Sequence, residues 1–239
     1  MDRLQIAQDG FRNPGSSSGT SPENNGYPLR SDQPPFVRAL SSFVSYVFHP
    51  LFIPAYVMAF LLFVHPYAFA GFEYRLKVLR FLSVVVSTAL LPAFSVFLLW
   101  RLEFIQTIFL RTQRERIIPY AIALIFYFWV WYVFKNLSDS PPVAKEFLLG
   151  VFLAVCFAWM ANIAYKVSMH STAVGGMLMF ILIQSFTDPT VGGTYVSIAL
   201  LITGLVCTAR LALGGHTRWD VYSGLLIGAA AQLIALWFN

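Results

Sequence analysis

The sequence predicts an all-α protein, a polytopic bundle of transmembrane helices, and two observations carry this prediction. The composition is 58% hydrophobic and only 11% charged, whereas soluble domains have about 45–50% apolar and about 25% charged residues. Apolar runs of roughly 20 residues, the length that crosses a bilayer, recur along the chain. These features exclude an ordinary soluble domain and a disordered chain. The basic residues behind the formal charge of +5 are scattered between apolar runs, so no nucleic-acid partner is expected.

Residues 1–40 are expected to form a flexible polar tail, and residues 41–239 a single transmembrane domain. The stretch 10–35 is rich in Gly, Ser, Pro and Asn and is too poor in apolar residues to bury a core. It has no apolar segment followed by a small-residue cleavage site, so we do not expect a secretory signal peptide.

Seven apolar segments follow the tail, so six or seven spans are expected. They cover about residues 43–64, 80–100, 117–134, 147–165, 171–187, 194–212 and 219–238. The first contains Pro50 and Pro54, which predict a kink or a partly re-entrant segment. The Pro and Gly residues between the fifth and sixth predict a tight turn at residues 188–193. Once the residues assigned below to a phosphate site are set aside, the basic residues show no bias that orients the chain.

Ionisable residues gather in three clusters at the ends of these segments, where they are costly and usually functional. The clusters are Arg111-Thr-Gln-Arg114-Glu-Arg116-Ile-Ile-Pro119, Lys166-Val-Ser168-Met-His170-Ser171 and Arg210-Leu-Ala-Leu-Gly-Gly-His216-Thr-Arg218-Trp-Asp220. The chain crosses the membrane twice between successive clusters, so all three are expected on one face. Their cations, histidines, hydroxyls and carboxylate could then share one pocket.

These residue types suit phosphoryl transfer, whose transition state spreads negative charge over the equatorial oxygens. Arginine and lysine can hold the phosphate, one histidine can act as nucleophile, and another can protonate the leaving alcohol. Asp220 lies four residues after His216, a spacing that places both on one face of a helix and lets the carboxylate hold the imidazole N–H. Gly214 and Gly215 would let the backbone approach the phosphate closely.

The third cluster resembles the last signature of the type 2 phosphatidic acid phosphatase superfamily, Ser-Arg-x5-His-x3-Asp. Arg210, His216 and Asp220 match this signature in residue type and spacing, and Ala209 replaces the family's Ser. The resemblance covers about residues 105–238, with the motifs in the family's order.

The second cluster is similar to the family's Pro-Ser-Gly-His signature at Ser168 and His170, with Val167 and Met169 in place of Pro and Gly.

The first cluster resembles the family's Lys-x6-Arg-Pro signature more loosely. Arg111 stands at the Lys position and Pro119 at the Pro position, but Ile118 occupies the Arg position. Arg114 or Arg116 would then supply the missing guanidinium.

The resemblance implies metal-independent hydrolysis of a lipid phosphate or pyrophosphate, with no cofactor. It implies that His216 is the nucleophile that forms a phosphohistidine, that Asp220 orients it, and that His170 is the general acid. The residues expected to hold the phosphate are Arg111, Arg116, Lys166, Ser168 and Arg210. Expected substrates are an isoprenoid pyrophosphate, phosphatidic acid, phosphatidylglycerol phosphate or a lipid A phosphate, entering laterally between helices. The expected location is the bacterial inner membrane.

Other interpretations stay open for several of these residues. The arginines of the first cluster could face anionic headgroups, and Lys166 could be an interfacial lysine. His49 and His65, each followed by Pro, are interpreted as loop or helix-end residues. A metal site is disfavoured because the neighbouring cations favour an anion.

The first rival function is a non-catalytic lipid-phosphate-binding or membrane assembly protein, and it is motivated by Ile118 and Met169. The second is a small transporter or channel, which predicts charges near mid-membrane in several helices rather than at helix ends. A halide-oxidising relative is disfavoured because such relatives are soluble.

Overall fold

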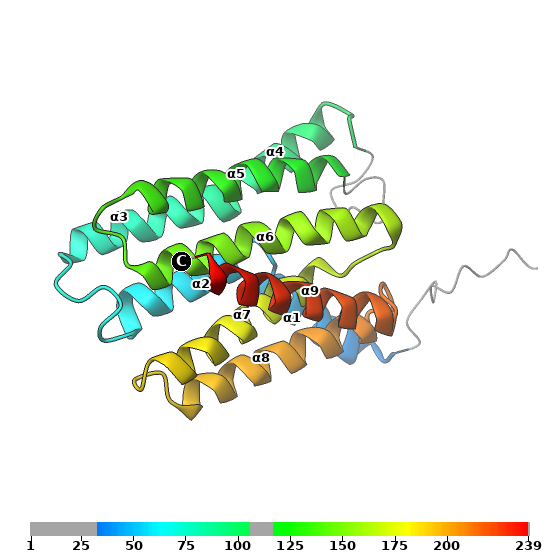
Figure 1. The fold of residues 1–239 in the computed structure, drawn as a ribbon. Helices are drawn as coiled ribbons and strands as arrows, with labels where there is room; N and C mark the ends of the chain where they lie inside the picture. Colours follow the sequence, from blue (N-terminus) through cyan, green and yellow to red (C-terminus); the bar gives the residue numbers. More distant parts are fainter. Residues whose placement is uncertain (1–32, 106–116, 239) are drawn as a thin grey trace, which may run out of the picture.

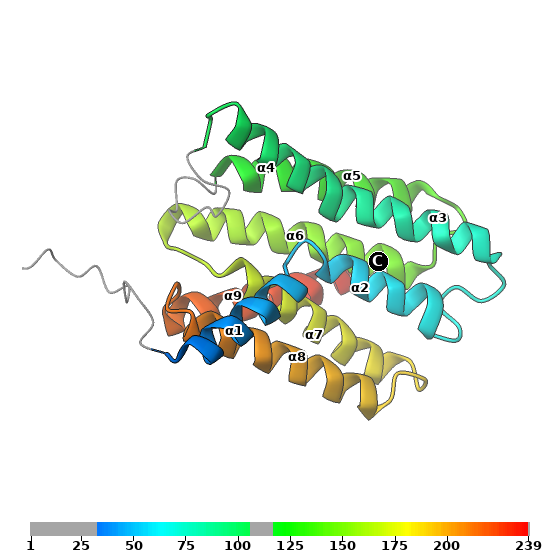
Figure 2. The ribbon, with the colours of Figure 1, turned by 180° about the vertical axis from the view of Figure 1, so that it is seen from behind.

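The computed structural model describes residues 33–105 and 117–238, and the secondary structure in these ranges is entirely helical. The predicted all-α class is therefore confirmed. Within the described ranges, six helices are long and apolar enough to span a membrane, so the chain is an integral membrane protein. Figures 1 and 2 show these helices side by side, with α3, α4 and α5 on one side of the bundle, α7 and α8 on the other, and α6 and α9 between them.

The spans begin with one continuous rod, in which α3, a π-helical turn η2 and α4 follow one another. The bounds are α3 (Tyr74–Val85), η2 (Val86–Leu90), α4 (Leu91–Arg101), α5 (Ile117–Asn136), α6 (Pro142–Ala164), α7 (Met169–Thr187), α8 (Gly193–Ala212) and α9 (Arg218–Trp237). These six spans correspond to the last six predicted segments, although the rod and α6 start at Tyr74 and Pro142 rather than at residues 80 and 147.

The first predicted segment, residues 43–64, is interrupted and does not form one span. It is divided between α1 (Pro35–Val47) and α2 (Ile53–Ala59), which continues into a second π-helical turn, η1 (Phe60–Val64). With 13 residues, α1 is about 20 Å long, shorter than the roughly 30 Å of a hydrocarbon core. The predicted tail boundary at residue 40 lies inside α1, because Pro35 occupies the first helical turn, where proline is well tolerated.

The rod is tied to α5 at its π-helical turn. Pro92 has no N–H and so cannot donate a helical hydrogen bond to the carbonyl of Thr88. The hydroxyl of Tyr127 in α5 donates to this carbonyl at 3.1 Å. Thr88 and Tyr127 are both buried, and a carbonyl left without a donor in such a place is costly. The bond therefore fixes the position of α5 against the rod.

Glycines allow α7 and α9 to pack closely, and theirs is the most extensive helix contact in the described ranges. Gly224 and Gly228 lie four residues apart on α9, the small-xxx-small spacing that brings membrane helices together. A Cβ atom on Gly228 would collide with the backbone carbonyl of Thr172 in α7, and one on Gly175 would lie 2.5 Å from the carbonyl of Leu225. The backbones of α7 and α9 thus touch with no side chain between them.

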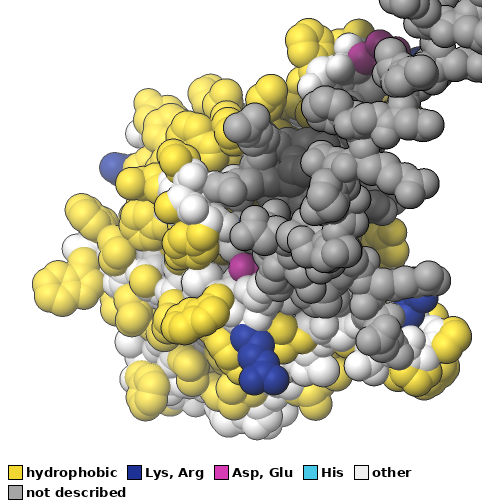
Figure 3. Space-filling model, turned by 90° about the vertical axis from the view of Figure 1, so that its right-hand side faces the viewer, with side chains coloured by type: hydrophobic (Ala, Val, Ile, Leu, Met, Phe, Trp, Pro, Cys, Tyr) yellow, Lys and Arg dark blue, Asp and Glu magenta, His cyan; other side chains and the backbone are white. Residues whose placement is uncertain are grey.

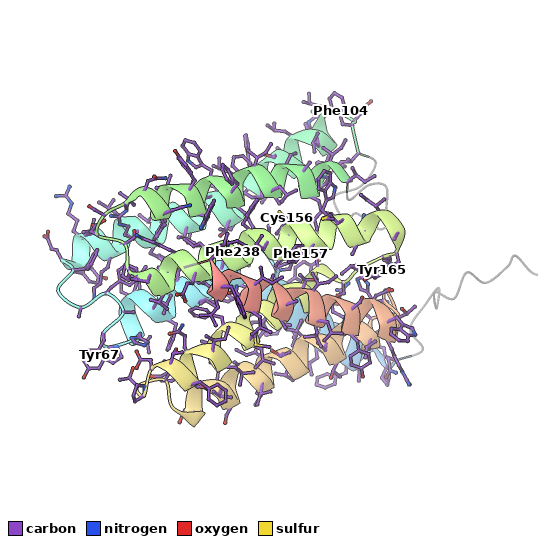
Figure 4. The ribbon with its side chains drawn as sticks, viewed as in Figure 1. Tyr67, Phe104, Cys156, Phe157, Tyr165 and Phe238 are labelled. Carbon is purple, nitrogen blue, oxygen red and sulfur yellow. The ribbon has the colours of Figure 1, made fainter. Side chains whose placement is uncertain are left out.

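The bundle has two ends. We call the end with loops 165–168 and 213–217 the site end, and the end with loops 65–73, 137–141 and 188–192 the far end. Figure 4 labels Tyr165 at the site end and Tyr67 at the far end.

Polar side-chain contacts join neighbouring segments at the far end. His65 directly follows η1, which confirms the prediction of a helix-end residue, and its Nε2 lies 3.2 Å from Asp188 Oδ2. Asp188 Oδ1 accepts the hydroxyl of Thr190 at 2.6 Å. Arg80 of α3 lies 2.7 Å from Asp139. These contacts connect segments far apart in the sequence.

Candidate functional site

The second and third clusters meet at the site end, as predicted from their parity. Lys166 Nζ donates to the carbonyl of Gly215 at 2.8 Å, and the backbone N–H of Ser168 donates to the carbonyl of Asp220 at 3.0 Å. From the first cluster, Pro119 lines a cavity that the other two clusters also line.

The arginines of the first cluster, Arg111, Arg114 and Arg116, lie outside the described residues, so their predicted phosphate contacts stay predictions. Ile118 is exposed at the start of α5.

His216 and Asp220 form a buried pair, in which His216 Nδ1 lies 3.4 Å from Asp220 Oδ2. The prediction that both residues lie on one helix is wrong. Gly214 has φ 69°, a backbone conformation that glycine adopts at little cost, and it turns the chain after α8. His216 therefore lies in the loop, and Asp220 lies in the first turn of α9. The pair forms because the loop folds back over the start of α9.

The N-terminus of α9 holds the Asp220 carboxylate. Thr217 caps the helix by accepting the N–H of Asp220 at 3.2 Å. The Asp220 carboxylate in turn accepts two hydrogen bonds from Thr217. Its Oδ2 accepts the backbone N–H of Thr217 at 3.0 Å, and its Oδ1 accepts the Thr217 hydroxyl hydrogen, with 2.9 Å between the oxygens. This is a capping box, and a negative charge in the first turn also suits the helix dipole. Asp220 can thus orient His216 Nδ1, which leaves Nε2 as the nitrogen for chemistry.

His170 lies in the first turn of α7 and contacts α1. Its Nε2 lies 3.1 Å from the backbone carbonyl of Ser45. A carbonyl oxygen only accepts, so Nε2 carries the proton of the neutral ring and Nδ1 carries the lone pair. A proton exchanged with a substrate would therefore pass through Nδ1.

The sequence prediction missed the contribution of α1 and of His49, which lies in the break between α1 and α2. The His49 ring meets the His170 ring edge to face, with 5.3 Å between centroids, and His49 lines the cavity. Burial, and then the positive charge of Arg210, lower the pKa of His49 from its ordinary value, so the ring is neutral at pH 7. Arg210 Nη1 lies 3.5 Å from Ser45 Oγ, which places a guanidinium beside the same helix.

The serines of α1 face inward while its large apolar residues face outward. Ser41 and Ser45 are buried, whereas Phe36 and Phe43 are exposed at 76% and 65%. This is the inverse of a soluble amphipathic helix. It suits a helix that has lipid on one side and a polar cavity on the other.

A cavity of about 800 Å³ connects these residues with the apolar interior. Its polar wall is formed by Ser45, His49, His170, Arg210 and His216. Most of its remaining wall comes from apolar residues of α4, α5, α6 and α7, among them Val96, Phe97, Phe147, Val151, Val155 and Met177. Figure 3 shows the molecule from the site end, where hydrophobic side chains cover much of the described surface. The cavity thus offers cationic and imidazole groups beside a wall suited to hydrocarbon.

Two predicted phosphate ligands do not line this cavity. Ser168 is fully buried, and its Oγ accepts the N–H of Ser171 at 3.4 Å as the N-cap of α7. Lys166 supports the loop before His216 through its bond to the Gly215 carbonyl. The structure therefore brings Arg210, His170, His216 and Asp220 together, and gives Ser168 and Lys166 contacts that hold the surrounding backbone.

Among the described residues, no group of three or more His, Cys, Asp and Glu side chains has a geometry that could hold a metal ion. The groups on the polar wall are cationic or neutral, so the site suits an anion.

Comparison with protein-family profiles, curated proteins and solved structures gave no match for this chain.

Proposed function

We propose that this protein is a membrane phosphatase that hydrolyses a lipid phosphate or pyrophosphate through a phosphohistidine on His216. The observation that supports the proposal is the cavity in which His216, His170 and Arg210 lie beside an apolar wall, with the buried Asp220 carboxylate in contact with His216. Such a cavity suits an amphiphile whose phosphate lies at the polar wall and whose chain lies among the apolar residues. The expected setting is the bacterial inner membrane.

In the first step, His216 Nε2 attacks phosphorus, and the bond between phosphorus and the leaving oxygen breaks. His170 takes up a second proton at Nδ1 when the anionic phosphate binds beside it, and it gives this proton to that oxygen, which leaves as the lipid alcohol or, from a pyrophosphate, as the lipid monophosphate. Asp220 stabilises the positive charge that develops on His216. Arg210 stabilises the negative charge on the transferring group.

In the second step, water attacks the phosphohistidine and the phosphorus–nitrogen bond breaks. Neutral His170 accepts the water proton at Nδ1, so inorganic phosphate is released and both histidines return to their starting states. The mechanism needs no metal ion, so EDTA is expected to leave turnover unchanged.

The test is phosphate release by purified protein from a panel of lipid phosphates and pyrophosphates. His216→Ala should lower release by about 10³-fold or more, and Arg210→Gln by about 10²-fold. Arg218→Gln is the matched control, because it removes an exposed arginine at the same end without touching the cavity lining. Full activity of the His216→Ala variant would contradict the proposal. Inhibition by EDTA that a divalent ion reverses would contradict it as well.

A second candidate is a non-catalytic protein that binds lipid phosphates. The observation favouring it is that Met169 lines the cavity next to His170, where the phosphatase family has glycine, while Ser168 is buried outside it. The same assay separates the two functions. Saturable binding of a lipid phosphate by folded protein, without release of phosphate from any member of the panel, is the result expected of the second.

A further inference from the structure

A second, smaller cavity opens at the far end between α5, α6 and α9. Its volume is about 260 Å³, and it is lined by Trp131, Lys135, Lys145, Glu146, Leu149, Leu153, Ala235 and Phe238. We call it the α5–α6–α9 groove. On α5, Lys135 of the groove lies 16 residues after Pro119 of the large cavity, which is about 24 Å along the helix axis.

Polar and apolar residues follow one another in the same order along two walls of the groove. On α6, Lys145, Leu149 and Leu153 are spaced by four residues and share one face. The two leucines lie about 6 Å and about 12 Å further along the helix axis than the lysine. On α5, Lys135 stands in the last turn, and Trp131 lies one turn deeper. Each wall therefore begins with a cation at the helix end and continues with apolar surface toward the middle of the bundle.

The charged groups gather at the mouth of the groove. Lys135 Nζ lies 4.9 Å from the centroid of the Trp131 ring, a cation–π distance that holds the ammonium over the groove. Lys145 and Glu146 are the fourth and fifth residues of α6, near its start. Two lysines and one glutamate give the mouth a net charge of +1, which a single phosphodiester balances.

We propose that the α5–α6–α9 groove binds one anionic phospholipid, with its phosphodiester between Lys135 and Lys145 and one acyl chain along Leu149 and Leu153. Basic pockets between helices at a membrane boundary suit lipid headgroups, and this groove adds an apolar floor in line with the cations. The lipid bound here is a structural ligand, and its site is separate from the proposed phosphatase site.

The test is native mass spectrometry of delipidated protein titrated with phosphatidylglycerol or with phosphatidylcholine of the same chains. The protein should bind one phosphatidylglycerol in preference to phosphatidylcholine. Lys135→Gln and Lys145→Gln should each weaken this binding about fivefold, and the double variant should lose the preference. The matched control is Arg75→Gln/Lys77→Gln, which removes two positive charges from the far end outside the groove, as many as the double lysine variant removes. This control should keep the preference for phosphatidylglycerol.

The position of the lipid is tested by fluorescence. Phosphatidylglycerol with brominated acyl chains should quench tryptophan emission of the wild type, and Trp131→Phe should remove part of that quenching. Binding of glycerophosphoglycerol without chains at equal affinity would overturn the proposal, because the apolar floor would then contribute nothing. Equal loss in the Arg75→Gln/Lys77→Gln control would overturn it as well.

The outcome is distinguishable from that of the phosphatase assay. His216→Ala and Arg210→Gln should abolish or lower phosphate release and leave phosphatidylglycerol binding unchanged. If Arg210→Gln removes that binding and the lysine variants do not, the lipid occupies the large cavity and the groove proposal is wrong.

Discussion

The His49 and His170 imidazoles lie beside the Arg210 guanidinium on the polar wall of the large cavity, and the hydrogen bonds of these two rings define the tautomer of each neutral ring. The Ser45 carbonyl fixes the proton of His170 on Nε2. His49 Nδ1 accepts the N–H of Leu51 at 3.4 Å, so the neutral His49 ring carries its proton on Nε2. His49 can thus donate one hydrogen bond to a bound phosphate without adding a charge.

This tautomer leads to a prediction for His49. His49→Phe keeps a ring against His170 but removes the donor, so the KM for a lipid phosphate should rise about tenfold while kcat changes little. His49→Gln restores a donor and should recover most of the affinity. Because the pKa of His49 is lowered, the ring stays neutral from about pH 6.5 upward, and the effect on KM should persist up to about pH 8. A fall in kcat with unchanged KM would contradict this binding role.

At the scale of elements, the contact between α7 and α9 positions the site, because His170 lies in the first turn of α7 and Asp220 in the first turn of α9. Their backbones are also joined directly, since the Ser168 N–H donates to the Asp220 carbonyl. The glycines of the contact lie deeper along the same two helices. A change in how these glycines pack should therefore shift His170 and Asp220, because these two residues lie on the same two helices.

Gly228→Ala tests this contact. The new Cβ would collide with the Thr172 carbonyl, and overpacking of this kind costs about 1–3 kcal/mol. The unfolding temperature in detergent should fall, with loss of activity at temperatures where the wild type is stable. Gly204→Ala on α8 is the matched control, since a Cβ there meets no atom within 4 Å and should leave stability unchanged or slightly raised. Equal stability of the two variants would show that α7 and α9 can separate at no cost.

The elements themselves were largely predictable from the sequence, because the length of an apolar run determines whether a helix can span the membrane. The spacing of Arg210, His216 and Asp220 likewise predicted a shared site. The His216–Asp220 pair formed by a different route from the predicted one, since Gly214 ends the helix before His216. Turn geometry of this kind depends on one backbone angle, which the pattern of residue types does not specify.

Other parts of the site were not predictable because they depend on tertiary contacts. Ser45 and His49 lie more than 100 residues before His170 in the sequence, and no spacing rule connects them. Lys166 and Ser168 have the residue types of phosphate ligands, but the packing of loop 165–168 on loop 213–217 and α9 gives both of them backbone partners. Only the path of the chain shows which polar residues reach the cavity.

At the scale of the whole molecule, side-chain contacts hold together segments of the far end that are distant in the sequence. The segment after η1 and the turn between α7 and α8 are joined by His65 and Asp188. Hydrogen bonds from the hydroxyl and backbone N–H of Thr190, at 2.6 and 2.8 Å, and then the nearby His65, hold the pKa of Asp188 below its ordinary value. The folded state thus favours the ionised carboxylate, so the contribution of this contact to the stability of the protein depends on pH.

The sign of that coupling gives the last prediction. A carboxyl group with a lowered folded pKa stabilises the protein fully above its unfolded pKa, about 3.9, and the contribution is lost as pH falls through the lowered folded value. The unfolding temperature of the wild type, measured in detergent from neutral to acid pH, should therefore decrease most steeply below about pH 4. Asp188→Asn should lower the unfolding temperature at pH 7 and flatten the acid part of the curve, and Thr190→Val should fall between the two. Parallel curves for the wild type and Asp188→Asn would show that this carboxylate does not hold the far end together, and that the adjoining Arg80–Asp139 pair and the helix packing suffice.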